Sequence, residues 1–285
     1  MVSSDLKLKL MVLPASLYIL LLTLYPLYKC IELAFSKMII QGGKIITLYA
    51  GLENFVRVFN DAIFYKSLET TLIFTVFPVV IELILGLLLA VIVASSKYSR
   101  IIVPIILTSM VMPPVTVALI WRFMFYPNIG LFDNLVRMIT GYSISWLGDP
   151  FWARISIIIV DVWHWTSFVF LLIYAGYVSL PTQYFEAASI DGGSDFQIFR
   201  HITLPLLKPT IALATLFRVI DVLQAFPELW QLTFGGPVYS TTILNILVYL
   251  ATFNFHDLGY ASVVSIILVL AAFFATVLYS KFRRG

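Results

Sequence analysis

The chain has 285 residues, of which 61% are hydrophobic and only 12% are charged, and its net charge is +3. Soluble globular proteins carry about 25% charged residues, so this composition excludes a soluble domain and indicates a protein embedded in lipid. The small net charge, without a basic tract, gives no indication of a nucleic-acid partner. A single cysteine, Cys30, excludes an internal disulfide. With three scattered histidines, it also argues against a metal site.

Long continuous apolar runs indicate membrane-spanning helices, because a segment in lipid must satisfy its own backbone hydrogen bonds. A β-barrel would instead show short alternating segments. About 20 apolar residues cross a bilayer core. The sequence therefore predicts an all-α polytopic membrane protein, as one transmembrane domain over residues 1–285. Its six predicted spans are Leu10–Leu33, Thr70–Ala94, Ile101–Tyr126, Ile155–Leu180, Ile211–Trp230 and Leu258–Tyr279.

Two apolar segments need separate interpretation, one at the N-terminus and one before the last span. The N-terminal run begins like a signal peptide, but it is nearly long enough to span, lacks an A-x-A-like site and precedes further spans, so we expect no cleavage. The apolar run Thr242–Phe255 has 14 residues and reaches about 21 Å, short of the roughly 30 Å core. We expect a helix at the outer surface or dipping part-way into the bilayer, and a seventh span is the alternative.

The distribution of lysine and arginine predicts the orientation. The stretch Gln231–Asp257 has none, as an outer loop should, whereas four basic residues between Lys37 and Lys66 weaken the pattern. We expect a multi-pass protein of the cell membrane with both termini in the cytoplasm. The positive charges then inside are Lys7, Lys9, Lys97, Arg100, Arg200, Lys208, Lys281, Arg283 and Arg284.

The loop between the fourth and fifth spans, residues 181–209, is longer than a tight connection requires. Pro181 can open a helix, Tyr184–Ile190 is good helical material, and Gly192 with Gly193 ends it. A second helical stretch covers Asp195–His201. We predict a short cytoplasmic helix that another protein approaches closely at its alanines, with Phe185 and Ile190 as apolar anchors. The alternative is a connector that only caps the bundle.

This loop resembles the EAA loop of binding-protein-dependent ABC importer permeases. The family pattern is Glu-Ala-Ala, three residues, Gly, nine residues, Ile, one residue and Leu-Pro. Every spacing is kept by Glu186-Ala187-Ala188, Gly192, Ile202 and Leu204-Pro205, and Asp191 also suits the pattern. Three further segments look like the sugar-permease branch, namely Gly51–Phe55, Trp146–Pro150 and Thr233–Pro237.

The resemblance implies a type I importer permease fold and a transport subunit that is not an enzyme. It implies coupling to the ATPase through Glu186, Ala187, Ala188, Asp191 and Gly192. The implied partners are a second, similar permease, two ATPase subunits, an external solute-binding protein, a sugar and membrane lipid. No cofactor is expected on this chain, with ATP and Mg on the ATPase. Consistently, the sequence has no G-x-x-x-x-G-K-[ST] phosphate loop, since Gly42-Gly43-Lys44 lacks the first glycine spacing.

Ionisable groups inside spans are expensive and mark candidate functional sites. The candidate substrate path comprises Asp161, Trp163 and His164 on span four, with Asp221, Gln224 and Glu228 recurring on one face of span five. Arg218 starts that face. Aromatic rings with amide and carboxylate acceptors suit a sugar. Alternatively, Arg218 and Asp221 pair with each other, the tryptophans anchor at the interface, and Glu82 is a protonated packing residue.

The competing function is an ion- or proton-coupled secondary transporter of a small polar solute, with Glu82, Asp161 and Asp221 as carriers. It leaves the long folded loop unexplained. A membrane enzyme needs a clustered catalytic constellation, which the sequence does not contain.

Several prolines lie inside or near the predicted spans. Each frees a backbone carbonyl group, so each is either a hinge or a static kink. They are Pro78, Pro104, Pro113, Pro114 and Pro227.

Overall fold

The computed structural model describes residues 4–41 and 44–284. Gly42 and Gly43, which the phosphate-loop comparison used, lie outside the described residues, as do the outermost residues of the termini. The described chain forms two compact units. One contains the chain up to Phe64 with Leu247–Val269, and the other contains Tyr65–Ile246 with the chain from Leu270 onward.

The prediction of a helical, multi-pass membrane protein is confirmed. Four helices of the described chain are long and apolar enough to cross a bilayer: α1 (Ser4–Ala34), α3 (Ala62–Ala94), α7 (Pro150–Val178) and α13 (Leu258–Arg284). The bent pair α4 (Ser99–Val111) and α5 (Pro114–Met124) passes the same test together. Helix α10 (Leu204–Gln224) has 21 residues, about 32 Å, which is long enough to cross, but it is not among the helices that pass this test.

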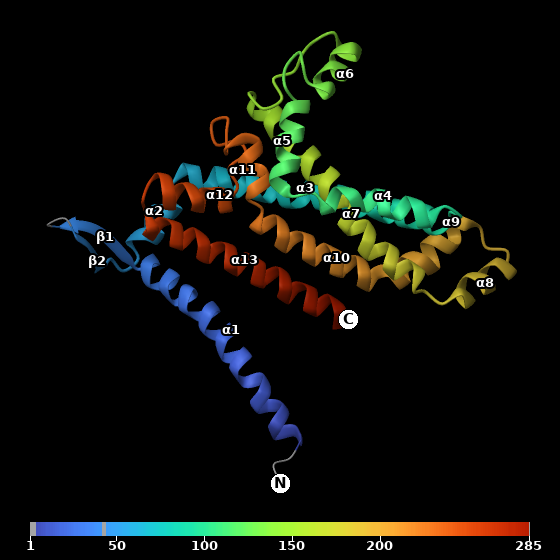
Figure 1. Ribbon diagram of the computed structural model, residues 1–285, viewed down its shortest axis with the longest axis horizontal. Helices are drawn as coiled ribbons and strands as arrows, with labels where there is room; N and C mark the ends of the chain where they lie inside the picture. Colours follow the sequence, from blue (N-terminus) through green and yellow to red (C-terminus); the bar gives the residue numbers. More distant parts are fainter. Residues whose placement is uncertain (1–3, 42–43, 285) are drawn as a thin grey trace. The chain divides into compact units, whose positions relative to one another are not determined.

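Helix α7 is central to the larger unit and packs against α4 and α10 (Figure 1). Glycine permits its closest contacts: a Cβ on Gly86 of α3 would lie 2.7 Å from Val169 Cγ1, and one on Gly176 of α7 would lie 2.8 Å from Thr210 Oγ1 of α10. Small residues let membrane helices approach in this way. The buried core between them comprises Ala90, Val93, Val169, Phe170, Ile173, Leu207 and Ala214.

Two predicted spans are interrupted. The segment Ile101–Tyr126 is not one straight helix, because α4 and α5 bend by 92° where Pro113 removes a backbone donor. The prediction of one helix over Ile211–Trp230 is also wrong. Helix α10 begins earlier, at Leu204, and ends at Gln224, and α11 (Pro227–Thr233) starts afresh, because a proline biases the residue before it away from helix.

A small helical subdomain, built on α6 (Leu131–Thr140), lies at the opposite end of α7 from the 181–209 loop (Figure 1). Its centre is the buried carboxylate of Asp133, which accepts hydrogen bonds from Asn128 N, Ser143 Oγ, Ile144 N and Trp146 Nε1 at 2.7–3.0 Å. Burial by itself would raise the pKa of Asp133, but these four donors stabilise the anion and hold its pKa below the ordinary value.

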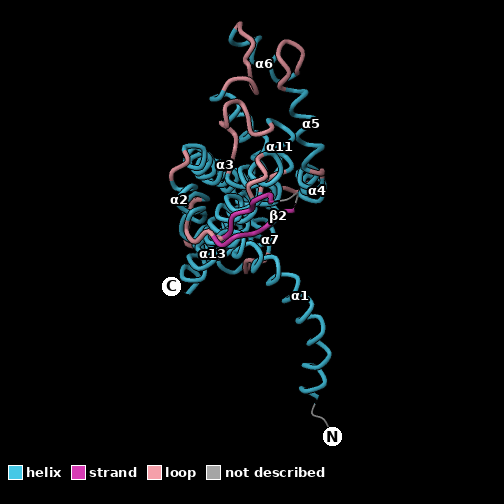
Figure 2. The backbone as a smooth tube through the Cα atoms, turned by 90° about the vertical axis from the view of Figure 1, so that its left-hand side faces the viewer, coloured by secondary structure: helices cyan, strands magenta, loops and turns pink. Residues whose placement is uncertain are grey.

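The smaller unit includes a β-hairpin that the sequence analysis did not anticipate, drawn in magenta in Figure 2. Strand β1 (Ser36–Gln41) pairs antiparallel with β2 (Lys44–Tyr49), with Ser36 opposite Tyr49. Helix α2 (Glu53–Phe59) follows. Its buried Asn54 donates hydrogen bonds to the carbonyls of Ala34 and Ser36, which fixes the start of the hairpin.

The predicted helix over Thr242–Phe255 is present as α12 (Leu244–Tyr249) followed by a π-helical turn, Leu250–Asn254. Its length of eleven residues, about 16 Å, is too short for a seventh crossing. Ile243, Leu244 and Ile246 are buried. The start of this helix is therefore packed inside the protein and does not lie free at a surface.

Candidate functional site

An ion cluster centred on Arg218 joins three helices of the larger unit. Arg218 of α10 donates from Nε and Nη2 to both carboxylate oxygens of Glu82 on α3, at 2.6 and 2.9 Å. Its Nη2 also donates to Asp161 of α7 at 2.7 Å, and its Nη1 to Asp221. The guanidinium carbon lies 5.1 Å from the ring centroid of Trp165.

Three members of this cluster are buried, and Asp221 is the exception with a side chain 48% exposed. A bidentate fork to a carboxylate is the geometry in which arginine stabilises a buried anion best. Glu82, for which the sequence left open a role as a protonated packing residue, has a cationic partner from another helix. The sequence left open a pairing of Arg218 with Asp221. This pair is present, as one contact of a larger cluster.

His164 forms a second buried contact set, which connects the two helix breaks. Its Nδ1 lies 2.7 Å from Glu228 Oε2 on α11, and its Nε2 lies 3.2 Å from the carbonyl oxygen of Met112, where α4 ends. A carbonyl only accepts, so Nε2 carries the hydrogen. The predicted alignment of Glu228 on the α10 face is wrong, because the break at Ala225–Phe226 turns it inward.

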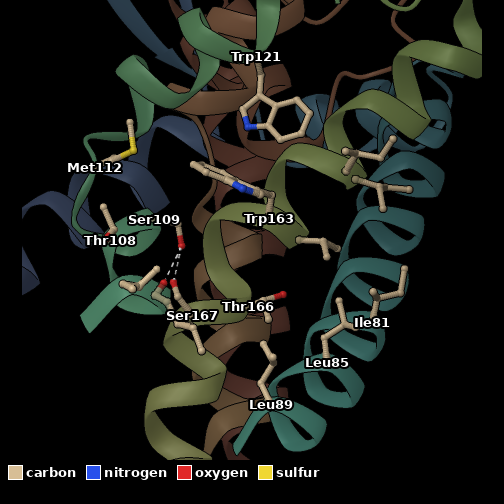
Figure 3. A pocket seen from close by; sticks show the side chains of 15 residues that line it. Ile81, Leu85, Leu89, Thr108, Ser109, Met112, Trp121, Trp163, Thr166 and Ser167 are labelled. Atoms are coloured by element: carbon tan, nitrogen blue, oxygen red, sulfur yellow. Dashed lines mark hydrogen bonds between the residues drawn. The ribbon is translucent and has the colours of Figure 1, made fainter. Parts of the chain in front are cut away.

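Trp163 lies on another side of α7 from the ion cluster. It lines an open, mostly apolar cavity of about 650 Å³ between α3, α4, α5 and α7, and its ring meets Trp121 edge-on with centroids 5.7 Å apart (Figure 3). Ser109 donates to Ser167 in the wall of this cavity, 2.9 Å apart. The structure therefore separates Trp163 from Asp161 and His164, with which the sequence grouped it.

The exposed polar face of α10 carries Phe217, Asp221 and Gln224, spaced four and three residues apart and hence on one side of the helix. An aromatic row lies beside it, in which Trp165 contacts Phe168 and Phe168 contacts Phe217, each with centroids 6.3 Å apart. The sequence analysis identified Asp221 and Gln224 but did not identify Phe168 or Phe217. The regular spacing of aromatic residues next to Asp161 and Arg218 was the available signal.

The 181–209 loop folds as predicted into α8 (Thr182–Ile190) and α9 (Asp195–Ile198), followed by a π-helical turn, Phe199–Thr203. Helix α8 ends in a Schellman motif, in which Gly193 N donates to Ala188 O and Gly192 N to Ser189 O. Gly192 has φ +78°, a left-handed conformation that favours glycine.

The surface of α8 is open, since the helix has no buried residue. Phe185 contacts Tyr177 at the end of α7, with ring centroids 6.0 Å apart, so it is an anchor as predicted. Ile190 is not, because it is 87% exposed. A hollow of about 340 Å³ beside α8 is lined by Ala188, Asp191, Gly192, Gly193, Gln197, Ile198, His201 and Ile202.

Residues 82–285 match the family described as binding-protein-dependent transport system inner membrane component. The chain is 36% identical over 237 residues to the trehalose/maltose transport system permease protein MalF of Thermococcus litoralis, covering 83% of this chain and 80% of that protein. It is 34% identical over 268 residues to the lactose transport system permease protein LacF of Rhizobium radiobacter, covering 92% of this chain and 88% of that protein.

The fold resembles a chain of a bacterial alginate ABC transporter solved in complex with an alginate pentasaccharide-bound periplasmic protein. The TM-score is 0.84 at 22% identity, over 98% of this chain and 94% of that chain. The ion cluster, the His164 contacts and the α8 loop all lie within the residues that match the family.

We predict that Arg218→Leu destabilises the protein by about 3–5 kcal/mol, because it leaves Glu82 and Asp161 buried without a partner. Arg218→Lys should fall between this variant and the wild type, since one ammonium cannot reproduce the fork. Thermal unfolding of the purified protein in detergent measures the effect. Arg100→Leu, at an exposed position, is the control, and equal unfolding temperatures for Arg218→Leu and Arg100→Leu would contradict the assignment.

Proposed function

The chain belongs to the binding-protein-dependent transport family of inner membrane components, and from this premise we propose that it forms half of the translocation path for a carbohydrate. The chain is the transport component of its importer, and ATP is hydrolysed on a separate chain. The observation that carries the proposal is the exposed face of α10, where Asp221 and Gln224 stand beside an aromatic row.

Charged and amide side chains at membrane depth face a bundle interior or a water-filled cavity, not lipid. The half-exposed Asp221 therefore marks the side of α10 that lines the path. Carboxylate and amide oxygens accept hydrogen bonds from sugar hydroxyls, and aromatic rings such as Phe217 contact the C–H face of a sugar ring. The relatives named for trehalose, maltose and lactose support a carbohydrate as the cargo.

The exposed α8 supports coupling to the ATPase. We propose that Glu186 makes a charge-assisted contact with that subunit and that Ala187 and Ala188 allow its close approach. Asp191 and Gly192 end the helix in the tight turn that presents this surface. The open hollow beside Gly193 is compatible with a protein partner at this face. ATP and Mg would bind the partner and not this chain.

The importer would contain further chains. Fewer than about eight spans rarely enclose a solute path, so a second permease, a similar chain, would complete it. Two ATPase subunits would bind at the cytoplasmic face, and a solute-binding protein would deliver the sugar on the other side. The chain is a multi-pass membrane protein, and the basic residues around the α8 loop support a cytoplasmic position for that loop and for both termini.

A secondary transporter would use Glu82, Asp161 and Asp221 as ion or proton carriers. All three are instead hydrogen-bonded to Arg218. A carrier must release its partner during transport, and two of these carboxylates would do so in a buried site at high cost. This geometry favours the ATP-driven function.

We expect proteoliposomes that contain this chain alone to show no uptake of radiolabelled trehalose, maltose or lactose under an imposed proton or sodium gradient. Addition of the second permease, the ATPase subunits and the binding protein should produce uptake that requires ATP. The control is the complete complex without ATP. Gradient-driven uptake by the isolated chain would overturn the proposed function in favour of a secondary transporter.

Within the complete importer, Asp221→Asn should raise the sugar concentration for half-maximal uptake about tenfold, because a charge-assisted hydrogen bond to the sugar is lost. Asparagine can still accept the hydrogen bond from Arg218, so thermal stability should change little. Initial uptake rates against sugar concentration provide the measurement. Glu69→Gln, at another exposed acidic residue of the same unit, is the matched control, and an unchanged apparent affinity in Asp221→Asn would remove this residue from the path.

Gly192→Val should leave membrane insertion intact but uncouple sugar uptake from ATP hydrolysis. A Cβ at this position meets nothing within 4 Å, so the effect comes from the left-handed backbone, which costs a β-branched residue about 1–2 kcal/mol. Gly141→Val is the matched control, because Gly141 has φ +79°, an equally open surrounding and a place outside the loop. Normal coupling in Gly192→Val, with both activities assayed on the same vesicles, would contradict the role of the loop.

A further inference from the structure

A second groove of the larger unit lies between α10 and the C-terminal part of α13, away from the polar face of α10 described above. Its volume is about 510 Å³. Ala212 on α10 and Ala275 on α13 help to line it, and these short side chains leave space between the two helices. The other lining residues are Leu204, Lys208, Ile211, Thr215, Leu216, Val219, Leu278 and Tyr279.

The groove is apolar along most of its length. Thr215 donates its hydroxyl to the carbonyl of Ile211 and so presents no free donor. On α10 the lining runs from Leu204 to Val219, fifteen residues or about 22 Å, and the part from Lys208 to Val219 is eleven residues or about 16 Å. The hydrocarbon core is about 30 Å thick, so this length matches one leaflet. The dimensions suit an extended hydrocarbon chain that enters from one membrane face.

Charge is concentrated at one end of the groove. Lys208 is exposed in this lining, which also includes Tyr279, and the exposed Lys281 follows Tyr279 by two residues on α13. Among the ion pairs that the described residues form, Lys208 has no carboxylate partner. The apolar groove therefore carries, near one end, an ammonium group that has no carboxylate partner among the described residues.

We propose that this groove binds an anionic phospholipid, with an acyl chain along α10 and the phosphate group at Lys208. Basic pockets between membrane helices recognise lipid head groups in this way. A transmembrane helix of another chain fits less well, because its apolar surface would cover the Lys208 ammonium without a counter-charge. The proposal concerns a lipid site distinct from the sugar path and does not depend on the identity of the transported solute.

The test uses the purified full chain and native mass spectrometry. The protein is incubated with equal amounts of phosphatidylglycerol and phosphatidylcholine of identical acyl chains, and the retained lipid is identified. Wild-type protein should retain phosphatidylglycerol preferentially. Lys208→Gln should lower that preference about fivefold, the effect of one lysine near an anionic lipid. Ala212→Phe fills the groove and should reduce retention of both lipids.

Lys97→Gln is the matched control, because it removes an exposed lysine of the same unit that lies outside the groove. An unchanged phosphatidylglycerol preference in Lys208→Gln, or an equal loss in Lys97→Gln, would overturn the proposal. The same measurement on the assembled importer separates lipid from protein as the occupant. Loss of the Lys208-dependent lipid on assembly would assign the groove to a partner helix and also overturn the proposal.

Discussion

The buried contact between Arg218 and the carboxylates of Glu82 and Asp161 is the constraint on which the larger unit depends. A charge removed from water costs several kcal/mol even after relaxation, and a good fork geometry offsets that cost only while every member keeps its place. The three side chains come from α10, α3 and α7. The cluster therefore fixes how these helices pack together, and the glycine contacts of α7 at Gly86 and Gly176 bring them close enough for it to form.

The same constraint explains why polar residues that look alike in the sequence differ in the structure. Asp161 is bound inside the protein by Arg218. His164, one turn later, is bound by Glu228 and by the carbonyl oxygen of Met112 at the end of α4. Asp221 contacts Arg218 through one carboxylate oxygen, and its side chain remains half-exposed and available to another partner. Buried pairing thus assigns a structural role to most of the ionisable groups and leaves the exposed face of α10 available for the proposed sugar path.

Much of the architecture could be predicted from the sequence, because length and apolar character decide whether a helix spans a bilayer. The α8 loop and its glycine stop could be predicted since Pro181 and Gly192 act locally, and the family that the loop resembles is confirmed by the match over residues 82–285. The break before Pro227 was missed because a proline can kink or end a helix, and the pairing of Glu82 with Arg218 was missed because 136 residues separate them. Trp163 and Trp165 point apart because two residues of a helix correspond to a rotation of about 200°.

The packing of α7 also bears on how a movement of the α8 loop would reach the proposed path. Tyr177 at the end of α7 contacts Phe185 of α8, while Asp161 and His164 in the same helix bind partners on α10 and α11 and at the end of α4. A bend within α7 between these points would open the buried core that Val169, Phe170 and Ile173 form with residues of α3 and α10, and a close-packed core does not tolerate such a gap. A rigid displacement of α7 with its bonded neighbours keeps every contact. The structure therefore favours transmission by a block of helices that moves as one body, with Asp221 carried along on the exposed face of α10.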